Sequence, residues 1–209
     1  MKIRWAFECL ALVSGLLPDA LLAIAANALL LNISSMVYMF YLGISIAANV
    51  RIGNALGAGE PARASLAAWL ALALAALGSC MCAAALIAGR HTLPHLFTED
   101  EEIDDYTSDL LIVAAVFQLP DAVNGAVQGI FRGSGRQRRG AILNFVAYYV
   151  AGIPIGIVLA FRWELGLLGL WVGMTIGLCI VGLTGTFMIL RSDWLTLAAN
   201  ANQRLGREQ

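Results

Sequence analysis

Charged residues are scarce in this chain of 209 residues: only 13% of them are Asp, Glu, Lys or Arg, and two are histidines. A soluble globular chain carries about 25% charged residues, so this one has too few polar groups to cover a surface that faces water. Hydrophobic residues make up 60% of the chain, and the mean hydropathy is +0.78. The composition therefore excludes a soluble enzyme and a disordered protein.

Cysteine and histidine are too few, and too poorly spaced, for a metal site. Cys80 and Cys82 point about 200° apart on a helix, and Pro94 interrupts any helix that would align His91 with His95. We therefore expect no disulfide and no metal, and we interpret the cysteines as small buried hydrophobic side chains. No Ser–His–Asp or Cys–His set is visible either, so we predict no catalytic residues and no enzymatic activity.

Long runs without charge are abundant instead. Crossing a bilayer takes about 20 residues, and four charge-free runs reach or exceed that length. The alternation typical of strands is absent, which argues against a β-barrel. The chain is therefore predicted to be an all-α, polytopic helical membrane protein. The four runs are Ala20–Val50, Ala64–Gly89, Gly140–Phe161 and Leu165–Leu190.

Six apolar segments in total predict a six-helix bundle over residues 1–194, followed by a polar cytoplasmic tail at 195–209. The first segment is too short to span and resembles a helix that lacks its N-terminal half. A signal peptide is the alternative, which Glu8 within the apolar run disfavours. The predicted helices cover residues 3–17, 22–50, 63–89, 108–131, 139–161 and 165–190.

The basic residues predict the orientation of the helices. Alternating the connections places eleven Lys and Arg residues on one side of the membrane and only Arg90 and Arg162 on the other. Positive charge accumulates on the cytoplasmic side, so both ends of the chain should be cytoplasmic. Seven of the fourteen acidic residues fall between Glu99 and Asp109, in a segment expected to be a loop on the opposite side.

Glycine recurs in two patterns. Two segments, Gly53–Gly59 and Gly129–Gly135, place three glycines at a helix exit, where we expect helix ends rather than phosphate-binding loops. Glycines spaced by four residues are expected to let helices approach closely. Pro154 interrupts one such helix, and we expect it to bend there and free a carbonyl group. The spaced sets are Gly125, Gly129 and Gly133; Gly152 and Gly156; and Gly169, Gly173 and Gly177.

Two carboxylates lie within predicted spans, Glu8 and Asp121. A lone charge there costs about 3 kcal/mol or more, and such residues commonly line ion or substrate pathways. Polar and tyrosine side chains accompany them, which favours a cavity that accepts cations. The candidate proton- and substrate-binding residues are Asp121, Glu8, Asn32, Gln118, Asn144, Tyr148 and Tyr149.

Several blocks, in order, resemble the multidrug and toxic compound extrusion (MATE) transporters, with wording closest to the eukaryotic branch. The resemblance covers roughly residues 3–194 and is to helices seven to twelve of the family. The matching blocks include Trp5-Ala6-Phe7-Glu8, Val37-Tyr38-Met39, Ala47–Gly59, Phe97-Thr98-Glu99-Asp100, Phe117-Gln118-Leu119 with Asp121, Arg132-Gly133-Ser134-Gly135, Asn144 with Tyr148-Tyr149, Gly152-Ile153-Pro154 and Gly169-Leu170-Trp171.

The resemblance implies one lobe of a fold in which two six-helix lobes flank a central cleft. It implies that acids of this lobe exchange protons and receive cationic substrates, and Asp121 matches such a position. Glu8 matches the second acid of the family's seventh helix, whereas Ile3 stands where the first acid is usual. Arg4 replaces a tryptophan, and Asn32 stands where some animal members have an acid.

The favoured function is a secondary active efflux transporter, a proton-coupled antiporter of organic cations, present as a half-length lobe. The alternatives are a truncated or partner-dependent membrane protein that does not transport, and a lipid flippase of similar architecture. We expect no cofactor besides a proton gradient as the energy source. The expected partners are small organic cations, the bilayer of the plasma, vacuolar or another organellar membrane, and a separate N-terminal lobe, but no nucleic acid.

Overall fold

The computed structural model describes residues 2–97 and 100–205, with side chains described over 8–97 and 100–203. Within these residues every regular element is helical, which confirms the all-α prediction. The elements are α1 (Lys2–Ser14), α2 (Ala20–Gly57), α3 (Pro61–Ala88), η1 (Pro94–Leu96), α4 (Glu101–Gly133), α5 (Gln137–Phe145), η2 (Val146–Gly152), α6 (Ile153–Ile157), η3 (Val158–Arg162), α7 (Gly166–Leu190) and α8 (Trp194–Leu205).

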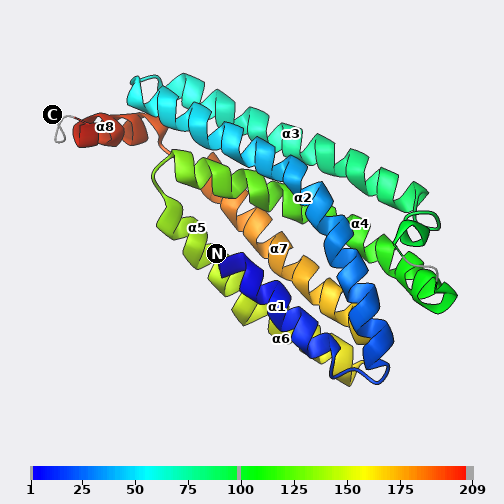
Figure 1. Ribbon diagram of the computed structural model, residues 1–209. Helices are drawn as coiled ribbons and strands as arrows, with labels where there is room; N and C mark the ends of the chain where they lie inside the picture. Colours follow the sequence, from blue (N-terminus) through cyan, green and yellow to red (C-terminus); the bar gives the residue numbers. More distant parts are fainter. Residues whose placement is uncertain (1, 98–99, 206–209) are drawn as a thin grey trace.

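Five of the described helical segments are long and apolar enough to cross a membrane: α2, α3, α4, the combined segment Gln137–Arg162, and α7. The 13 residues of α1 extend only about 20 Å, less than the bilayer core, as its short apolar run predicts. The spans run alternately up and down, so the last turns of α2, α4 and α7 gather at one end of the bundle (Figure 1). We call this the basic end, because the connections there carry most of the arginines.

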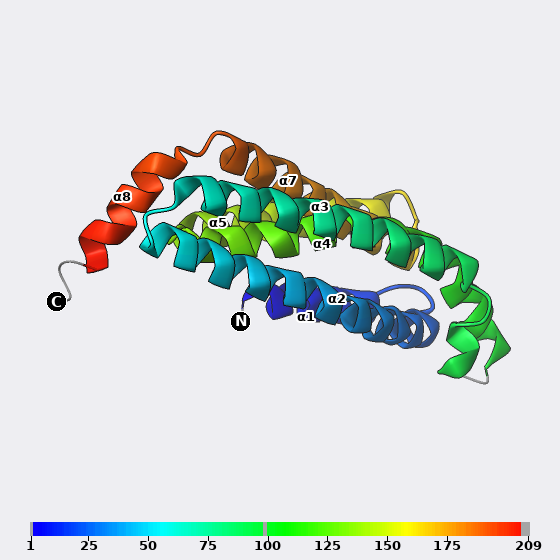
Figure 2. The same ribbon diagram turned by 90° about the horizontal axis from the view of Figure 1, so that it is seen from above.

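Helix α4 is the centre of the bundle. It packs against α2, α3 and α7, and it is the most buried of the five spans. Figure 2 shows α4 lying between the layer formed by α1 and α2 and the layer that contains α3 and α7. A side chain on α4 can therefore be enclosed on several sides, which is the position that an intramembrane polar group requires.

The acidic segment that we expected to be a loop is helical from Glu101 onward, and its Glu99 lies outside the described residues. Helix α4 begins at Glu101, not at 108, and the Asp100 side chain accepts hydrogen bonds from the backbone N–H groups of Glu102 and Ile103. Acidic residues in a first turn interact favourably with the helix dipole, which explains why this charged stretch is helical. His95 Nε2 lies 3.3 Å from the buried carboxylate of Asp104.

The glycine patterns have the roles that the sequence predicts. Gly59 and Gly135, with φ of 72° and 70°, end α2 and α4 in the left-handed conformation that glycine adopts most easily. At Gly133 an added Cβ would lie 2.6 Å from the Asn49 carbonyl oxygen of α2. At Gly173 it would overlap the backbone of Gly156, so α7 and α6 are in direct backbone contact.

The helix that contains Pro154 is continuous from Gln137 to Arg162, and π-helical turns lie on both sides of the proline. On the N-terminal side of the proline, the seven residues Val146–Gly152 form the π-helical segment η2. On its C-terminal side, Val158–Arg162 form a second π-helical segment, η3. A π turn shifts the hydrogen-bond ladder by one residue, which accommodates a proline that cannot donate. The span therefore continues through α6 to Arg162.

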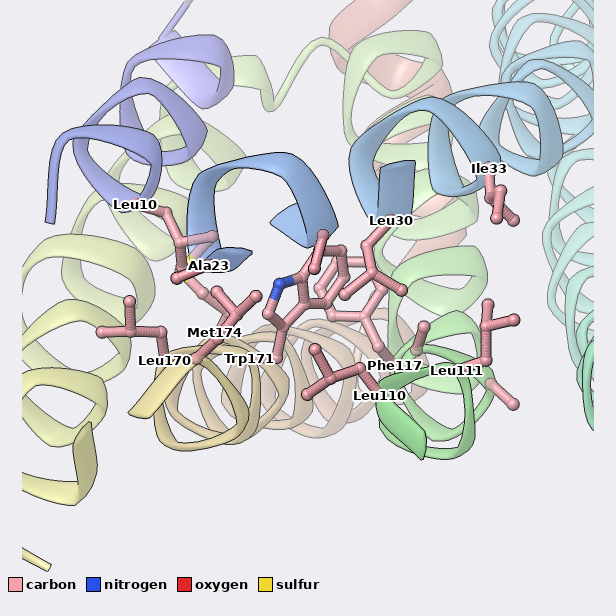
Figure 3. Packing of buried hydrophobic residues seen from close by; sticks show 14 of the residues in the cluster. Leu10, Ala23, Leu30, Ile33, Leu110, Leu111, Phe117, Leu170, Trp171 and Met174 are labelled. Carbon is pink, nitrogen blue, oxygen red and sulfur yellow. The ribbon is translucent and has the colours of Figure 1, made fainter. Parts of the chain in front are cut away.

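Aromatic and polar groups fix α7 in the core. The Trp171 ring contacts Phe117 of α4 edge to face, with centroids 5.1 Å apart, and its Nε1 donates to Asn27 Oδ1 of α2 at 3.1 Å. Figure 3 shows this indole among Leu30, Phe117 and Met174. One buried hydrogen bond thus links α2 to α7 inside an otherwise apolar cluster.

One expectation is corrected here, and the C-terminal segment gains a description. Cys80 and Cys179 are exposed on the outside of the bundle rather than buried among the helices. The predicted polar tail is the helix α8 through Leu205, and its Ala198 is buried against the core. Helix α8 packs against α2 and α3 and runs across the basic end of the bundle (Figure 2).

Candidate functional site

A polar stripe runs along the buried helix α4. Its members are separated by three or four residues, so they lie on one face of the helix, and that face is directed at α2 and at the span Gln137–Arg162. Most of these side chains are buried, which is costly unless they bind one another or a ligand. They are Gln118, Asp121, Asn124, Gln128 and Arg132.

The half of the stripe nearer the basic end forms a hydrogen-bond network. Asn124 Nδ2 donates to the Tyr148 hydroxyl at 3.4 Å, and Gln128 Nε2 donates to Asn124 Oδ1 at 3.2 Å. Arg132 donates to Ser45 Oγ of α2 at 2.8 Å. Three separate helices are therefore joined through polar side chains.

A cavity of about 320 Å³ adjoins this network, which is within the range of small-molecule sites. Its walls come from α2, α4 and the α5–η2 segment. Its polar lining consists mainly of amide and hydroxyl groups rather than of charges. The polar and aromatic lining residues are Tyr38, Ser45, Asn124, Gln128, Arg132, Gln137, Asn144, Phe145, Tyr148 and Tyr149.

Asp121 lies beside the cavity, one turn along α4 from Asn124. Its side chain is buried, with 7% of its surface exposed, and among the described residues no hydrogen bond or ion pair is formed to it. The carboxylate interacts electrostatically with the tyrosines Tyr38, Tyr41 and Tyr148. A buried carboxylate without a cation is unstable as a permanent arrangement, so this group is suited to bind a proton or a cation.

The other predicted residues on α4 and α5–η2 lie in the same region. Gln118 is fully buried and donates to Ser34 Oγ at 3.4 Å, while its Oε1 has no partner in the described part of the chain. Asn144 Oδ1 is likewise unpaired within the described residues. Tyr149 stacks on Phe145 with centroids 5.3 Å apart. Unused acceptors and ring faces are the groups that a cationic ligand binds.

Glu8 and Asn32 are separate from this cluster. Both side chains are exposed on the lobe, on α1 and α2, and α1 packs on α2, α6 and α7. The structure therefore does not bring together Glu8 and Asp121, the two carboxylates that the sequence places within predicted spans. Instead, one polar group of the short helix α1 and one of the span α2 lie uncovered on the surface of this lobe.

Seven of the polar and aromatic cavity residues were not among those predicted: Tyr38, Ser45, Asn124, Gln128, Arg132, Gln137 and Phe145. A signal for two of them exists, because Gln128 and Arg132 continue the spacing of four from Asn124. Arg132 lies eleven residues beyond Asp121, or about 16 Å along α4. Its positive charge is thus at the basic end, away from the carboxylate. In the described residues no three His, Cys, Asp or Glu side chains gather as a metal site would need.

Comparisons with known proteins agree over nearly the whole chain. Residues 4–158 match the MatE family model. The chain is 34% identical over 201 residues to Protein DETOXIFICATION 14 of Arabidopsis thaliana and 36% identical over 202 residues to Multidrug and toxin extrusion protein 1 of Danio rerio. These alignments cover 96% and 97% of the chain.

Solved structures give the same result for the fold. The crystal structure of the eukaryotic MATE transporter AtDTX14 superposes with a TM-score of 0.92 at 34% identity, covering 96% of this chain. This chain covers 45% of that structure, 41% of the Arabidopsis relative and 34% of the Danio relative. It thus spans less than half the length of the proteins it matches.

Proposed function

Because this chain belongs to the MATE family of multidrug and toxin extrusion transporters, and spans less than half the length of its relatives, we propose that it is the second lobe of a two-lobe efflux transporter. The chain is an integral membrane protein. The proposed activity is proton-coupled antiport of small organic cations, rather than an enzymatic reaction. The proton gradient would be the energy source, with no bound cofactor.

One observation supports this function above the others: a buried, unpaired Asp121 carboxylate beside a cavity of tyrosine and amide groups. The charged form attracts an organic cation, whose apolar body packs against the Tyr148 and Tyr149 rings. Protonation removes that attraction and also relieves the cost of a buried charge. Proton entry from one side would therefore favour release of the cation on that side.

Coupling needs the two binding events to exclude each other. A single carboxylate satisfies this requirement, because it cannot neutralise a proton and an organic cation at once. Alternating access would come from rocking this lobe against a second lobe around the site. The rigid α4 core, packed on α2, α3 and α7, is suited to move as one body in such a step.

The position of the second lobe is suggested by the uncovered polar groups. Glu8 on the short helix α1 and Asn32 on the span α2 are exposed, and in hydrocarbon a charged carboxylate costs about 3 kcal/mol. We propose that the N-terminal lobe covers this face and that Glu8 then lines the cleft between the lobes. The exposed carboxylate of Glu8 would then line the transport pathway instead of facing hydrocarbon at a cost in free energy.

We predict that this lobe alone inserts into liposomes but does not transport. A cleft needs two walls, and one lobe leaves its site open. Uptake of ethidium into liposomes with an acidic lumen should match protein-free liposomes for the 209-residue chain, and should rise and saturate when the N-terminal lobe is co-reconstituted. Saturable uptake by the single lobe would contradict the two-lobe proposal. No uptake with both lobes would favour the second candidate, a partner-dependent membrane protein that does not transport.

We also predict that the basic end is cytoplasmic, from the asymmetry of eleven basic residues against two. Asp105 near the start of α4 and Gln137 at the start of α5 are both exposed and lie at opposite ends of the bundle. In a variant with all four cysteines replaced by alanine, an impermeant maleimide added to intact cells should label Asp105→Cys and not Gln137→Cys. Permeabilised cells, in which both should react, are the control. The reverse pattern would refute the orientation.

A further inference from the structure

A second, larger pocket lies at the basic end, outside the polar cavity. Its volume is about 900 Å³, and its walls are the last turns of α2, α4 and α7, the start of α5, and α8. These are the places where the spans leave the hydrocarbon region. The pocket therefore lies at the depth of lipid headgroups, enclosed on one side by α8.

The pocket has a strongly positive lining. Four arginines and one aspartate line it: Arg132, Arg136, Arg139, Arg191 and Asp193. Asp193 is already occupied, because it caps α8 by accepting from the Thr196 hydroxyl at 2.6 Å and from the Leu195 and Thr196 N–H groups. These hydrogen bonds hold the pKa of Asp193 below its ordinary value, and the bond from the Thr196 side chain has the largest effect. None of the four arginines has a carboxylate within ion-pair distance among the described residues.

Arg136 is the most constrained of the four. Its Nε donates to Ser134 Oγ at 3.0 Å and its Nη1 to Ser192 Oγ at 2.7 Å, while the guanidinium lies over the Phe131 ring. Its Nη2 is buried and donates to nothing in the described part of the chain. Burial, together with the nearby charge of Arg139, lowers the pKa of Arg136. A guanidinium held in place at the wall of a pocket is a ready partner for an oxyanion.

We propose that this pocket binds the phosphate of an anionic phospholipid headgroup, with Arg136 as the fixed donor and Arg139 and Arg191 closing over it. The shared chemistry is a phosphate ester, which planar guanidinium groups bind bidentately. A lipid is favoured over a soluble phosphate because Phe187, exposed on α7, lines the same pocket and continues it towards the bilayer. Basic pockets between spans on the cytoplasmic side are a recurring form of lipid recognition.

The binding would fasten several elements together. An anion at Arg136 joins the α4–α5 turn to the end of α7, since Arg136 already contacts Ser192 there. The charge of the headgroup would offset the repulsion among four arginines in one pocket. The site is independent of the transport function proposed above, because none of the three arginines that would contact the headgroup lines the polar cavity.

Native mass spectrometry of the detergent-purified chain tests this proposal. Dioleoylphosphatidylglycerol should bind at least about tenfold more tightly than dioleoylphosphatidylcholine, which has the same acyl chains. Arg136→Gln and Arg139→Gln should each weaken binding of the anionic lipid about fivefold. The Arg139 side chain forms no hydrogen bond within the described residues, so its variant keeps the test valid if Arg136→Gln misfolds. Arg138→Gln, at an exposed neighbouring position outside the pocket, is the matched control and should bind as the wild type does.

Three results would overturn the proposal. Equal binding of the two lipids would show that the headgroup does not determine the affinity. Equal losses in Arg138→Gln and Arg139→Gln would indicate general charge rather than a pocket. If inorganic phosphate at the same concentration raised the melting temperature as much as the anionic lipid does, the site would be one for a soluble anion.

Discussion

Replacing Asp121 with asparagine is expected to stop proton-driven efflux by the assembled two-lobe transporter while the protein still inserts and folds. Asparagine keeps the size of the side chain but cannot lose a proton, so it is fixed in a neutral state. The site would then neither attract a cation by charge nor exchange it for a proton. Uptake of ethidium into liposomes with an acidic lumen should fall to the level of protein-free liposomes, and Asp121→Glu should retain partial activity.

Asp105→Asn is the matched control for this experiment. The same substitution on the same helix changes an exposed residue in the acidic first turns of α4, far from the polar cavity. It should leave the initial rate of uptake unchanged. Wild-type rates in Asp121→Asn under the same pH gradient would make the carboxylate structural, and the coupling proposed here would be wrong.

Gly173→Ala is expected to destabilise the lobe more than any conservative surface change. The added Cβ would overlap the backbone of Gly156, and neither α6 nor α7 can move without breaking the contacts at Gly169 and Gly177. Overpacking of this kind costs about 1–3 kcal/mol. At about 2–4 °C per kcal/mol for a chain of this size, the apparent Tm in detergent should drop by about 2–12 °C.

Gly43→Ala is the control, because it makes the same change on a helix with no atom within 4 Å of the new Cβ. Removal of a helical glycine should leave the Tm unchanged or raise it slightly. Size-exclusion chromatography after heating, followed by tryptophan fluorescence, measures both variants. Equal melting temperatures for the two would contradict the inferred backbone contact between α6 and α7.

Much of this architecture could be predicted from the sequence because lipid imposes strict rules. Every span must satisfy its own backbone, so long charge-free runs indicate helices. The glycines spaced by four residues predicted that helices approach one another closely, because small residues in apolar spans commonly mark helix–helix contacts. The start of α4 was harder to predict from the sequence. Seven acids suggested a loop, whereas the Asp100 cap and the helix dipole stabilise a helix there.

The candidate site could be predicted only in part. Composition identified Asp121 as costly, and its neighbours along α4 follow from helical spacing. Tyr38 and Ser45 belong to the cavity because α2 crosses α4 at that height, which depends on tertiary packing and leaves no local signal. Glu8 illustrates the opposite error. It is equally costly by composition, yet this lobe leaves it exposed and away from the cavity.

The central place of α4 bears on how the protein reaches the membrane. Of the five spans, α4 has the lowest mean hydropathy and the greatest burial. During synthesis α2 and α3 emerge first, so a helical hairpin already stands in the bilayer when the polar stripe of α4 leaves the ribosome. Helix α4 can then enter against protein rather than against lipid, and its retention depends on those neighbours more than on its own partitioning. Substitutions on α2 that weaken this contact would therefore reduce the yield of inserted protein before they affect any transport step.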